Sequence, residues 1–507
     1  MASKRPRLLL KRVSIVTFFT GLNLCASFLN QAVLAYFFGA SRSMDAFLIS
    51  GALPFAVLNL AIGDLSYTLV PLLMGYENTG EERRVSDSAF TALSVLALAV
   101  AVVGALGHRL ILRLTTAGSM PPQTFELAAS IAPMVWVVVG LTVLGSFLTG
   151  LHHFPRSFSY PAMTLALPYL GMIAGGLLGA SRFGIVSVVT GWAVATLLRD
   201  IALYRLLPPP RVRFHWSPWH PAVARLFRST YMLGISLLPF TVLPVIDTFW
   251  ASRLPIGSIS YLGYCSRIII ALAGMVVQGL CVVLFTDFSE DIANHNIASF
   301  HRKLVAAIHG ILLFIVPLAT LVLVLRSTLV SILLERGHFL PSATLGVIRV
   351  LPFYLLGMTF MAPMTIVIRG FYALGDYATP AKVGVLSLVA YTIASGLLVR
   401  HYSYIGIGMA YAMFWCLTLA VECYALGNKV GHLLGADFFA FLGKVTLSSL
   451  AAGCAVNFLI EPLHATLGQY LGPGCAAGVG LSIFIVLAHF VFRVPQFRTL
   501  AGFVTQR

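Results

Sequence analysis

Apolar runs of twenty or more residues recur along this chain and are separated by short polar turns. A helix needs about 20 consecutive apolar residues to cross the hydrocarbon core of a membrane. Apolar residues make up 59% of the 507 positions, and charged residues only 10%. A soluble domain needs roughly a quarter of its residues charged. Most of the outer surface of this protein is therefore expected to face lipid.

The apolar runs lack the polar–apolar alternation of membrane-barrel strands, so we expect an all-α polytopic membrane protein. The basic start, 1–12, resembles the beginning of a signal peptide. However, the run after it is too long and has no clear cleavage site, so we expect a retained first helix. The chain is expected to form about 14 transmembrane helices. They are expected near 13–38, 45–73, 89–108, 126–150, 159–180, 184–206, 230–252, 258–286, 303–326, 346–370, 381–400, 404–427, 437–460 and 469–492.

The 33 Lys and Arg residues lie mainly in the turns on one side of these helices. Cytoplasmic turns of membrane proteins are enriched in Lys and Arg, which places both chain ends in the cytoplasm. The expected location is a bacterial inner membrane. The formal charge of +16 is explained by these turns, so nucleic acid is not expected as a partner.

The segment 207–229 interrupts this pattern, because it is rich in Pro and basic residues and carries Trp216 and Trp219. It divides the chain into an N-terminal lobe of six helices (1–206), a basic cytoplasmic linker (207–229), a C-terminal lobe of six helices (230–427) and two further helices with a tail (428–507). The linker is expected either to lie on the lipid surface through its Trp and Arg residues or to bind a partner protein.

An internal repeat relates the two lobes. Gly150 is followed by Pro161 at the start of the next helix, and Gly370 is followed by Pro380 in the same way. Proline suits the first turn of a helix, where its missing N–H is not needed. The spacing of roughly 220 residues between the copies matches two six-helix halves with the same orientation.

Five ionisable residues interrupt the apolar runs. A charge inside the membrane is costly, so each is a candidate for function. Asp45, Asp64, Asp247 and Arg267 are predicted to line a substrate cavity. The position of Asp45 at a helix start also suits a structural carboxylate. Glu422 is expected to be interfacial and structural.

Asp247 and Arg267 occupy successive helices, so they are expected either to pair with each other or to serve substrate binding. Arginine suits an anionic headgroup, because its guanidinium engages phosphate with two hydrogen bonds and stays charged. The spacing of Gly171, Gly175 and Gly179 predicts close helix packing.

Motifs of nucleotide-binding, metalloprotease and serine-hydrolase sites are absent from the sequence, so an enzyme is not expected. The seven cysteines lie in apolar runs without CxxC spacing, so neither a metal nor a cofactor is expected. Transport would be driven by an ion gradient, the membrane potential or substrate flow, and a coupling cation is left open.

Four stretches resemble the MurJ/MviN family in order and spacing: Phe37–Leu73 with the FGA and DAF motifs, Ile246–Ile268, the LLERGHF loop of Leu333–Phe339, and Arg369–Val383. The resemblance implies a multidrug/oligosaccharidyl-lipid/polysaccharide flippase fold. It also implies a central cavity between two six-helix lobes, and a lipid-facing groove on helices thirteen and fourteen.

The implied activity is the flipping of a polyprenyl-pyrophosphate-linked saccharide, such as lipid II, by alternating access. Arg267 and Asp45 match family positions. Family members that flip lipid II typically carry arginines in the first helix, and the corresponding residues here are Leu24 and Asn30. The loss of cationic partners weakens pyrophosphate binding, so a related lipid-linked glycan is equally open.

Three hypotheses follow from the sequence. The first is a monomeric flippase in which Arg267 binds the phosphate and Asp45, Asp64 and Asp247 shape the cavity or take part in ion coupling. The second is a cation-coupled exporter of small amphipathic molecules on the same fold. The third is a non-transporting scaffold for wall or polysaccharide synthesis, which would bind its partners through 207–229.

Overall fold

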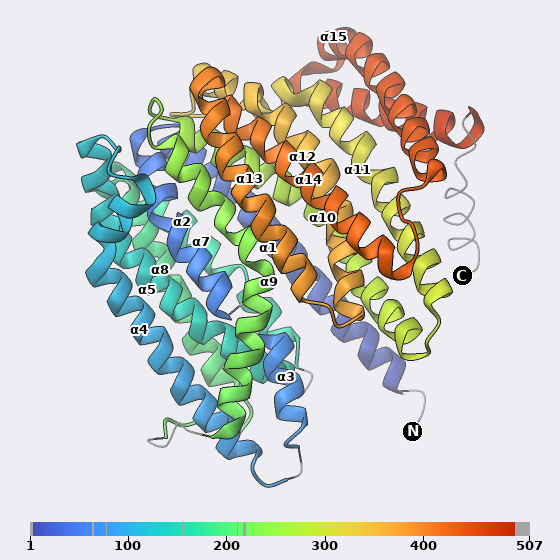
Figure 1. The fold of residues 1–507 in the computed structure, drawn as a ribbon. Helices are drawn as coiled ribbons and strands as arrows, with labels where there is room; N and C mark the ends of the chain where they lie inside the picture. The colour runs from blue at the N-terminus through green and yellow to red at the C-terminus, as the bar shows by residue number, and fades with distance from the viewer. Residues whose placement is uncertain are drawn as a thin grey trace. The chain divides into compact units, whose positions relative to one another are not determined.

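The computed structural model describes residues 4–62, 65–77, 79–154, 157–209, 211–215 and 220–491, and within these ranges the chain is helical without strands (Figure 1). The helices are α1 (Lys4–Phe38), α2 (Arg42–Ile62), α3 (Ser66–Met74), α4 (Glu82–Thr116), α5 (Pro122–His153), α6 (Ser159–Thr164), α7 (Leu167–Phe183), α8 (Ile185–Leu206), α9 (Pro221–Ala251), α10 (Ser258–Ala293), α11 (Ile297–Leu334), α12 (Pro341–Ala373), α13 (Ala378–Tyr402), α14 (Tyr404–Val430), α15 (Ala436–Val486) and η1 (Leu487–Val491).

The predicted all-α membrane fold is confirmed. Every predicted span coincides with helix in the described ranges, with α2 and α3 sharing the second span and α6 and α7 the fifth. Eleven helices there are long and apolar enough to cross a membrane. The last two spans form α15, which is broken at Gly468, where φ is +79°. Glycine adopts this left-handed φ without strain, so the chain turns here between two helical halves.

The chain divides into two compact units: residues 1–260 with 336–340, and residues 261–335 with 341–507. In the first unit, α7 packs closely on α8. A Cβ atom on Gly171 would lie 2.4 Å from the Gly191 carbonyl oxygen, and one on Gly175 would lie 2.2 Å from the Ser187 carbonyl oxygen. The predicted role of these glycines in packing is confirmed, because only glycine permits such backbone approach.

The LLERGHF loop belongs in part to the first unit, although it lies far along the chain. The His338 N–H donates to the Tyr36 carbonyl oxygen at the end of α1 at 2.8 Å. A Cβ atom on Gly337 would lie 2.4 Å from that same oxygen. The short loop is therefore fixed to α1 by backbone contacts that need a glycine.

In the second unit, α14 packs between α12 and α13, and the first half of α15 packs on α11 (Figure 1). The His309 ring of α11 stacks on Phe438 and Phe441 of α15, with ring centroids 5.8 Å and 4.2 Å apart. The second half of α15 joins the same contact, since Ala476 lies in one buried cluster with Leu325 and Val456.

The internal repeat recurs in the local geometry of both units. Pro161 and Pro380 are each the third residue of their helices, α6 and α13. Gly184 joins α7 to α8 with φ 56° and ψ −142°. Ser403, 219 residues later, joins α13 to α14 with φ 54° and ψ −141°. The two helical hairpins thus turn through the same backbone conformation.

This shared turn leads to a stability prediction. A side chain at positive φ strains the backbone by about 1–3 kcal/mol. We expect Ser403→Gly to raise the free energy of unfolding by about 1 kcal/mol. Gly184→Ala should lower it by a similar amount, because the added Cβ meets no atom within 4 Å and only the backbone is strained. Denaturant titration in mixed micelles would check both, and equal stability of Ser403→Gly and wild type would contradict the strain.

The turn between α12 and α13 is held by Asp376. Its Oδ1 accepts a hydrogen bond from the Thr379 N–H at 3.0 Å, and its Oδ2 pairs with Lys429. Burial acts to raise the pKa of Asp376, but these hydrogen bonds and the Lys429 charge outweigh it and lower the pKa from 3.8 to about 2.

A pH dependence of stability follows. Because the folded-state pKa of Asp376 lies below the unfolded value, its stabilising contribution is complete above about pH 4 and is lost as the pH falls towards 2. We expect Asp376→Asn to lower the melting temperature at pH 6 and to have little effect near pH 2. Lys429→Met is the matched control. It removes the partner of Asp376, so the melting temperature should depend less on pH over the same range. Melting temperatures measured between pH 2 and pH 6 would test this prediction. An equal drop in melting temperature for Asp376→Asn at both pH values would refute it.

The predicted linker 207–229 is partly helix, because α9 already begins at Pro221. Residues 211–215 lie on the first unit. There the Arg213 N–H donates to Asp87 Oδ1 at 2.8 Å, and the His215 N–H donates to Thr91 Oγ1 at 2.9 Å. Arg225 donates to the Tyr76 hydroxyl. The described part of the linker is therefore fixed to α4 and to the end of α3; binding to lipid or to a partner stays a prediction.

Candidate functional site

Asp45 lies in the first turn of α2 and is buried, with 4% of its surface exposed. Its Oδ2 accepts the Gly257 N–H at 2.6 Å. Its Oδ1 accepts the Ser260 N–H at 2.9 Å and the Ser260 hydroxyl at 2.5 Å. The N–H groups of the first turn of a helix have no partners within the helix, and a carboxylate there also interacts favourably with the helix dipole. Asp45 thus caps α10 from another helix.

The space beside Asp45 is small. A cavity of about 20 Å³ remains there, lined by residues such as Met120, Thr124 and Ile259. This volume accommodates about one water molecule. In this conformation Asp45 ties α2 to the start of α10, and its predicted part in a substrate cavity stays a prediction.

The other predicted cavity residues are placed less completely. Asp64 lies outside the described residues. Asp247 lies in α9 and Arg267 in α10, and both are partly buried. They belong to different compact units, so their pairing and the predicted cavity between the lobes stay predictions.

A buried ion pair in α8 was not predicted from the sequence. Arg199 Nη2 lies 3.0 Å from Asp200 Oδ1, with side-chain exposures of 14% and 4%. A Cβ atom on Gly145 of α5 would lie 1.7 Å from Arg199 Nη2 and 2.4 Å from Asp200 Oδ1, so the glycine makes room for the pair. An acid and a base next to each other at the end of a span resemble an ordinary interfacial pair, so no sequence signal marked them.

Glu422 was expected to be interfacial and structural, and both its depth in the membrane and its role stay predictions. Glu422 lies in α14 and is completely buried, and neither carboxyl oxygen has a hydrogen-bond partner. Its nearness to the helix end suggested exposure, but α14 is covered there by α12 and α13.

Two residues of α1, at the positions where the family resemblance implies arginines, differ in their burial. Leu24 is 45% exposed, whereas Asn30 is buried at 1% with its Oδ1 unpartnered. The described residues bring no three His, Cys, Asp or Glu side chains together as a metal site would require.

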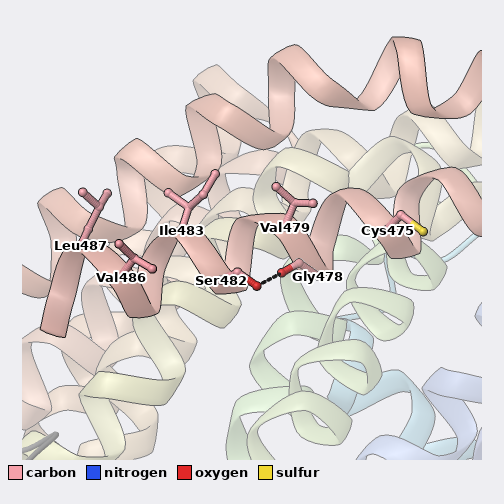
Figure 2. Close-up of a pocket in the computed structure, with 7 residues that line it drawn as sticks. All are labelled: Cys475, Gly478, Val479, Ser482, Ile483, Val486 and Leu487. Atoms are coloured by element: carbon pink, nitrogen blue, oxygen red, sulfur yellow. Dashed lines mark hydrogen bonds between the residues drawn. The ribbon is translucent and has the colours of Figure 1, made fainter. Parts of the chain in front are cut away.

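An apolar groove follows one face of the second half of α15 and continues onto η1 (Figure 2). It is shallow and widely open, and the space over this helix face is about 580 Å³. The lining recurs every three to four residues, as expected for one helix face. The Ser482 hydroxyl donates to the Gly478 carbonyl oxygen at 2.9 Å, which satisfies it within the helix. The lining residues are Cys475, Gly478, Val479, Ser482, Ile483, Val486 and Leu487.

This groove suits an apolar chain. It offers almost no unsatisfied polar group, and each buried CH₂ contributes about 0.8 kcal/mol. It lies on the last predicted span, where the family resemblance implies a lipid-facing groove.

Comparisons with solved structures agree with this fold. A lipid II flippase MurJ in an inward closed conformation matches with a TM-score of 0.80 and 21% identity, covering 94% of this chain and 98% of the other. An inward-facing MATE multidrug transporter of the MOP superfamily matches with a TM-score of 0.70 and 12% identity, over 83% and 97% of the two chains.

Curated relatives span nearly the whole length. A probable lipid II flippase MurJ of Buchnera aphidicola subsp. Acyrthosiphon pisum is 23% identical, covering 87% of this chain and 88% of the relative. The lipid II flippase MurJ of Burkholderia cenocepacia is 22% identical over 89% and 91%. The family model described as lipid II flippase MurJ matches residues 34–470. Because this match covers most of the chain, the protein belongs to the MurJ family, a family of multi-pass membrane transporters.

Proposed function

We propose that the chain translocates a polyprenyl-pyrophosphate-linked saccharide, lipid II or a related glycan, across a bacterial inner membrane by alternating access. The family match over residues 34–470 is the observation that carries this proposal, since the relatives are named lipid II flippases. That match does not favour the exporter or the scaffold hypothesis.

The substrate's two ends call for different surfaces, and the chain offers both. The apolar groove on α15 accepts the polyprenyl tail. Arg267 binds the pyrophosphate, because a guanidinium forms two parallel charge-assisted hydrogen bonds to phosphate oxygens. Asp45 holds the start of α10, the helix that carries Arg267, and thereby positions the binding residue.

The remaining features belong to the same proposal. Both termini lie in the cytoplasm, as the Lys and Arg distribution favours. The proposal includes the N-terminal lobe (1–206) and the C-terminal lobe (230–427), and assigns Asp64 and Asp247 to substrate translocation together with Arg267. One chain carries both lobes and the groove, so a monomer is sufficient. We include a coupling cation in the proposal as an energy source for the cycle.

The experiment that tests the proposal compares substrates with the purified full chain in proteoliposomes. Lipid II, a polyprenyl-pyrophosphate disaccharide without peptide, and a short-tailed analogue are each placed in one leaflet. Protein-dependent movement of the long-tailed substrates supports the proposal. If none of the three substrates moves, the proposal is rejected.

A substitution in the groove tests the tail site. Gly478 lines the groove, and a Cβ there meets no atom within 4 Å, so Gly478→Leu fills space without a clash. Excluding two CH₂ groups of the tail costs about 1.6 kcal/mol, or roughly tenfold in affinity. We expect Gly478→Leu to slow translocation of the long-tailed substrate about tenfold and to leave the short-tailed one unaffected.

Gly474 provides the matched control. It lies one turn earlier on the same helix, is equally open and does not line the groove. Gly474→Leu should therefore translocate at the wild-type rate. Equal slowing by both variants would show that the groove does not hold the tail.

A further inference from the structure

Glu422 differs from every other buried acid in the described ranges. Asp45 receives three hydrogen bonds from α10. Asp200 Oδ1 lies 3.0 Å from Arg199 Nη2, and Asp291 Oδ2 lies 2.8 Å from Lys303 Nζ. Glu422 is 0% exposed, and both of its oxygens lack a hydrogen-bond partner.

The position of Glu422 on α14 follows from the packing of α12. A Cβ atom on Gly357 would meet Tyr411 and Trp415, and one on Gly370 would meet Leu426. The two helices therefore run in the same direction. Glu422 comes seven residues after Trp415 and four before Leu426, on the same face of α14. It faces the part of α12 between the two glycines.

No cation on α12 or α11 neutralises Glu422. Between the two glycines, α12 carries one charged residue, Arg369, whose guanidinium donates to the Thr365 carbonyl oxygen of its own helix at 2.8 Å. On α11, the near end carries three basic residues. His301 contacts the His432 carbonyl oxygen at 3.1 Å, Arg302 is exposed and Lys303 pairs with Asp291.

The other titratable groups on the neighbouring helices lie on α13 and on α14 itself. On α13, Lys382 is exposed, and the buried Tyr391 ring packs on Phe414 with centroids 5.7 Å apart. On α14 itself, Lys429 pairs with Asp376, and the neighbouring Cys423 is a buried thiol.

An ionised carboxylate without partners in a buried site is prohibitively unfavourable, so such a group takes up a proton instead. In this conformation Glu422 is therefore a neutral carboxylic acid. In a conformation in which water reaches Glu422 on α14, the ionised carboxylate becomes more favourable than the neutral acid. There the O–H bond breaks, the electron pair stays on the oxygen and the proton passes to water.

We propose that Glu422 is the proton-binding site that couples this transporter to a proton gradient, with one proton bound in the dry conformation and released in a hydrated one. This assignment rests on the proposed flippase function for its physiological role. Proton movement opposite to the substrate would then drive export. The proton site itself can be measured without transport.

The first experiment detects the proton. Infrared spectra of the purified full chain in lipid bilayers, wild type minus Glu422→Gln, should show the C=O stretch of a protonated carboxyl group at pH 7. Glutamine has nearly the same shape as the neutral acid, so the variant should fold, and its melting temperature checks this. Absence of the band in the folded pair would overturn the proposal.

The second experiment measures coupling. Lipid II translocation is followed in proteoliposomes with and without a pH difference of one unit, which is worth about tenfold for one coupled proton. Wild type should respond to the gradient. Glu422→Gln should lose that response while retaining slow, gradient-independent movement.

The control is Glu126→Gln, an exposed glutamate paired with Arg109 at 2.7 Å, which should behave like wild type. A full gradient response in Glu422→Gln would overturn the proposal. If wild type moves no substrate, the flippase function fails, and the infrared band alone then decides whether Glu422 binds a proton.

Discussion

Asp45→Ala is expected to lower the free energy of unfolding by about 3–5 kcal/mol. The substitution removes three hydrogen bonds and leaves the N–H groups of Gly257 and Ser260 buried without acceptors. Each of the two N–H groups left buried without an acceptor costs about 1–3 kcal/mol, and the lost bond from the Ser260 hydroxyl adds about 1 kcal/mol. Denaturant titration in mixed micelles measures the change.

Two variants separate the charge from the individual bonds. Asp45→Asn keeps one acceptor and loses the charge, so its free energy of unfolding should lie between those of wild type and Asp45→Ala. Ser260→Ala removes only the hydroxyl donor and should cost about 1 kcal/mol. If Asp45→Ala were no less stable than Ser260→Ala, the cap would not hold α10 as described.

Arg267→Ala is expected to abolish translocation while the protein stays folded. Two charge-assisted hydrogen bonds to the pyrophosphate are lost, which corresponds to about 3–6 kcal/mol and at least a hundredfold in rate. Arg267→Lys keeps the charge but not the two-pronged geometry, so it should retain partial activity. Translocation rates and melting temperatures are measured on the same preparations.

Arg253 provides the control for this experiment. It lies in the turn before α10, is exposed and stacks over Phe249 and Trp250 at 4.2 Å and 4.9 Å from the ring centroids. Arg253→Ala should transport normally. Unchanged transport by folded Arg267→Ala would refute the assignment of the headgroup to this residue.

The sequence predicted the helices well because lipid imposes a simple rule. The expected spans 184–206 and 404–427 lie on α8 (Ile185–Leu206) and α14 (Tyr404–Val430), each of which follows a turn residue with positive φ. The start of α9 was missed because its first turns, from Pro221, are basic and amphipathic. Hydropathy detects the part of a helix in lipid and not its polar extension.

The site was predicted only in part, because its contacts join distant residues. Asp45 was recognised as a helix-start carboxylate, but its partners Gly257 and Ser260 lie more than 200 residues later. Glu422 was judged by its distance from the helix end, whereas its burial depends on α12 and α13. The neighbouring helices decide whether a charged residue in a span is buried or exposed to water. A single sequence does not specify which helices are neighbours.

If this chain moves a pyrophosphate-linked lipid across a bilayer, transbilayer movement of labelled lipid II in proteoliposomes will show it. We expect the label to reach the opposite leaflet with the wild-type protein and to remain in place with Arg267→Ala. Label distributions that are identical in protein-containing and protein-free vesicles would contradict it.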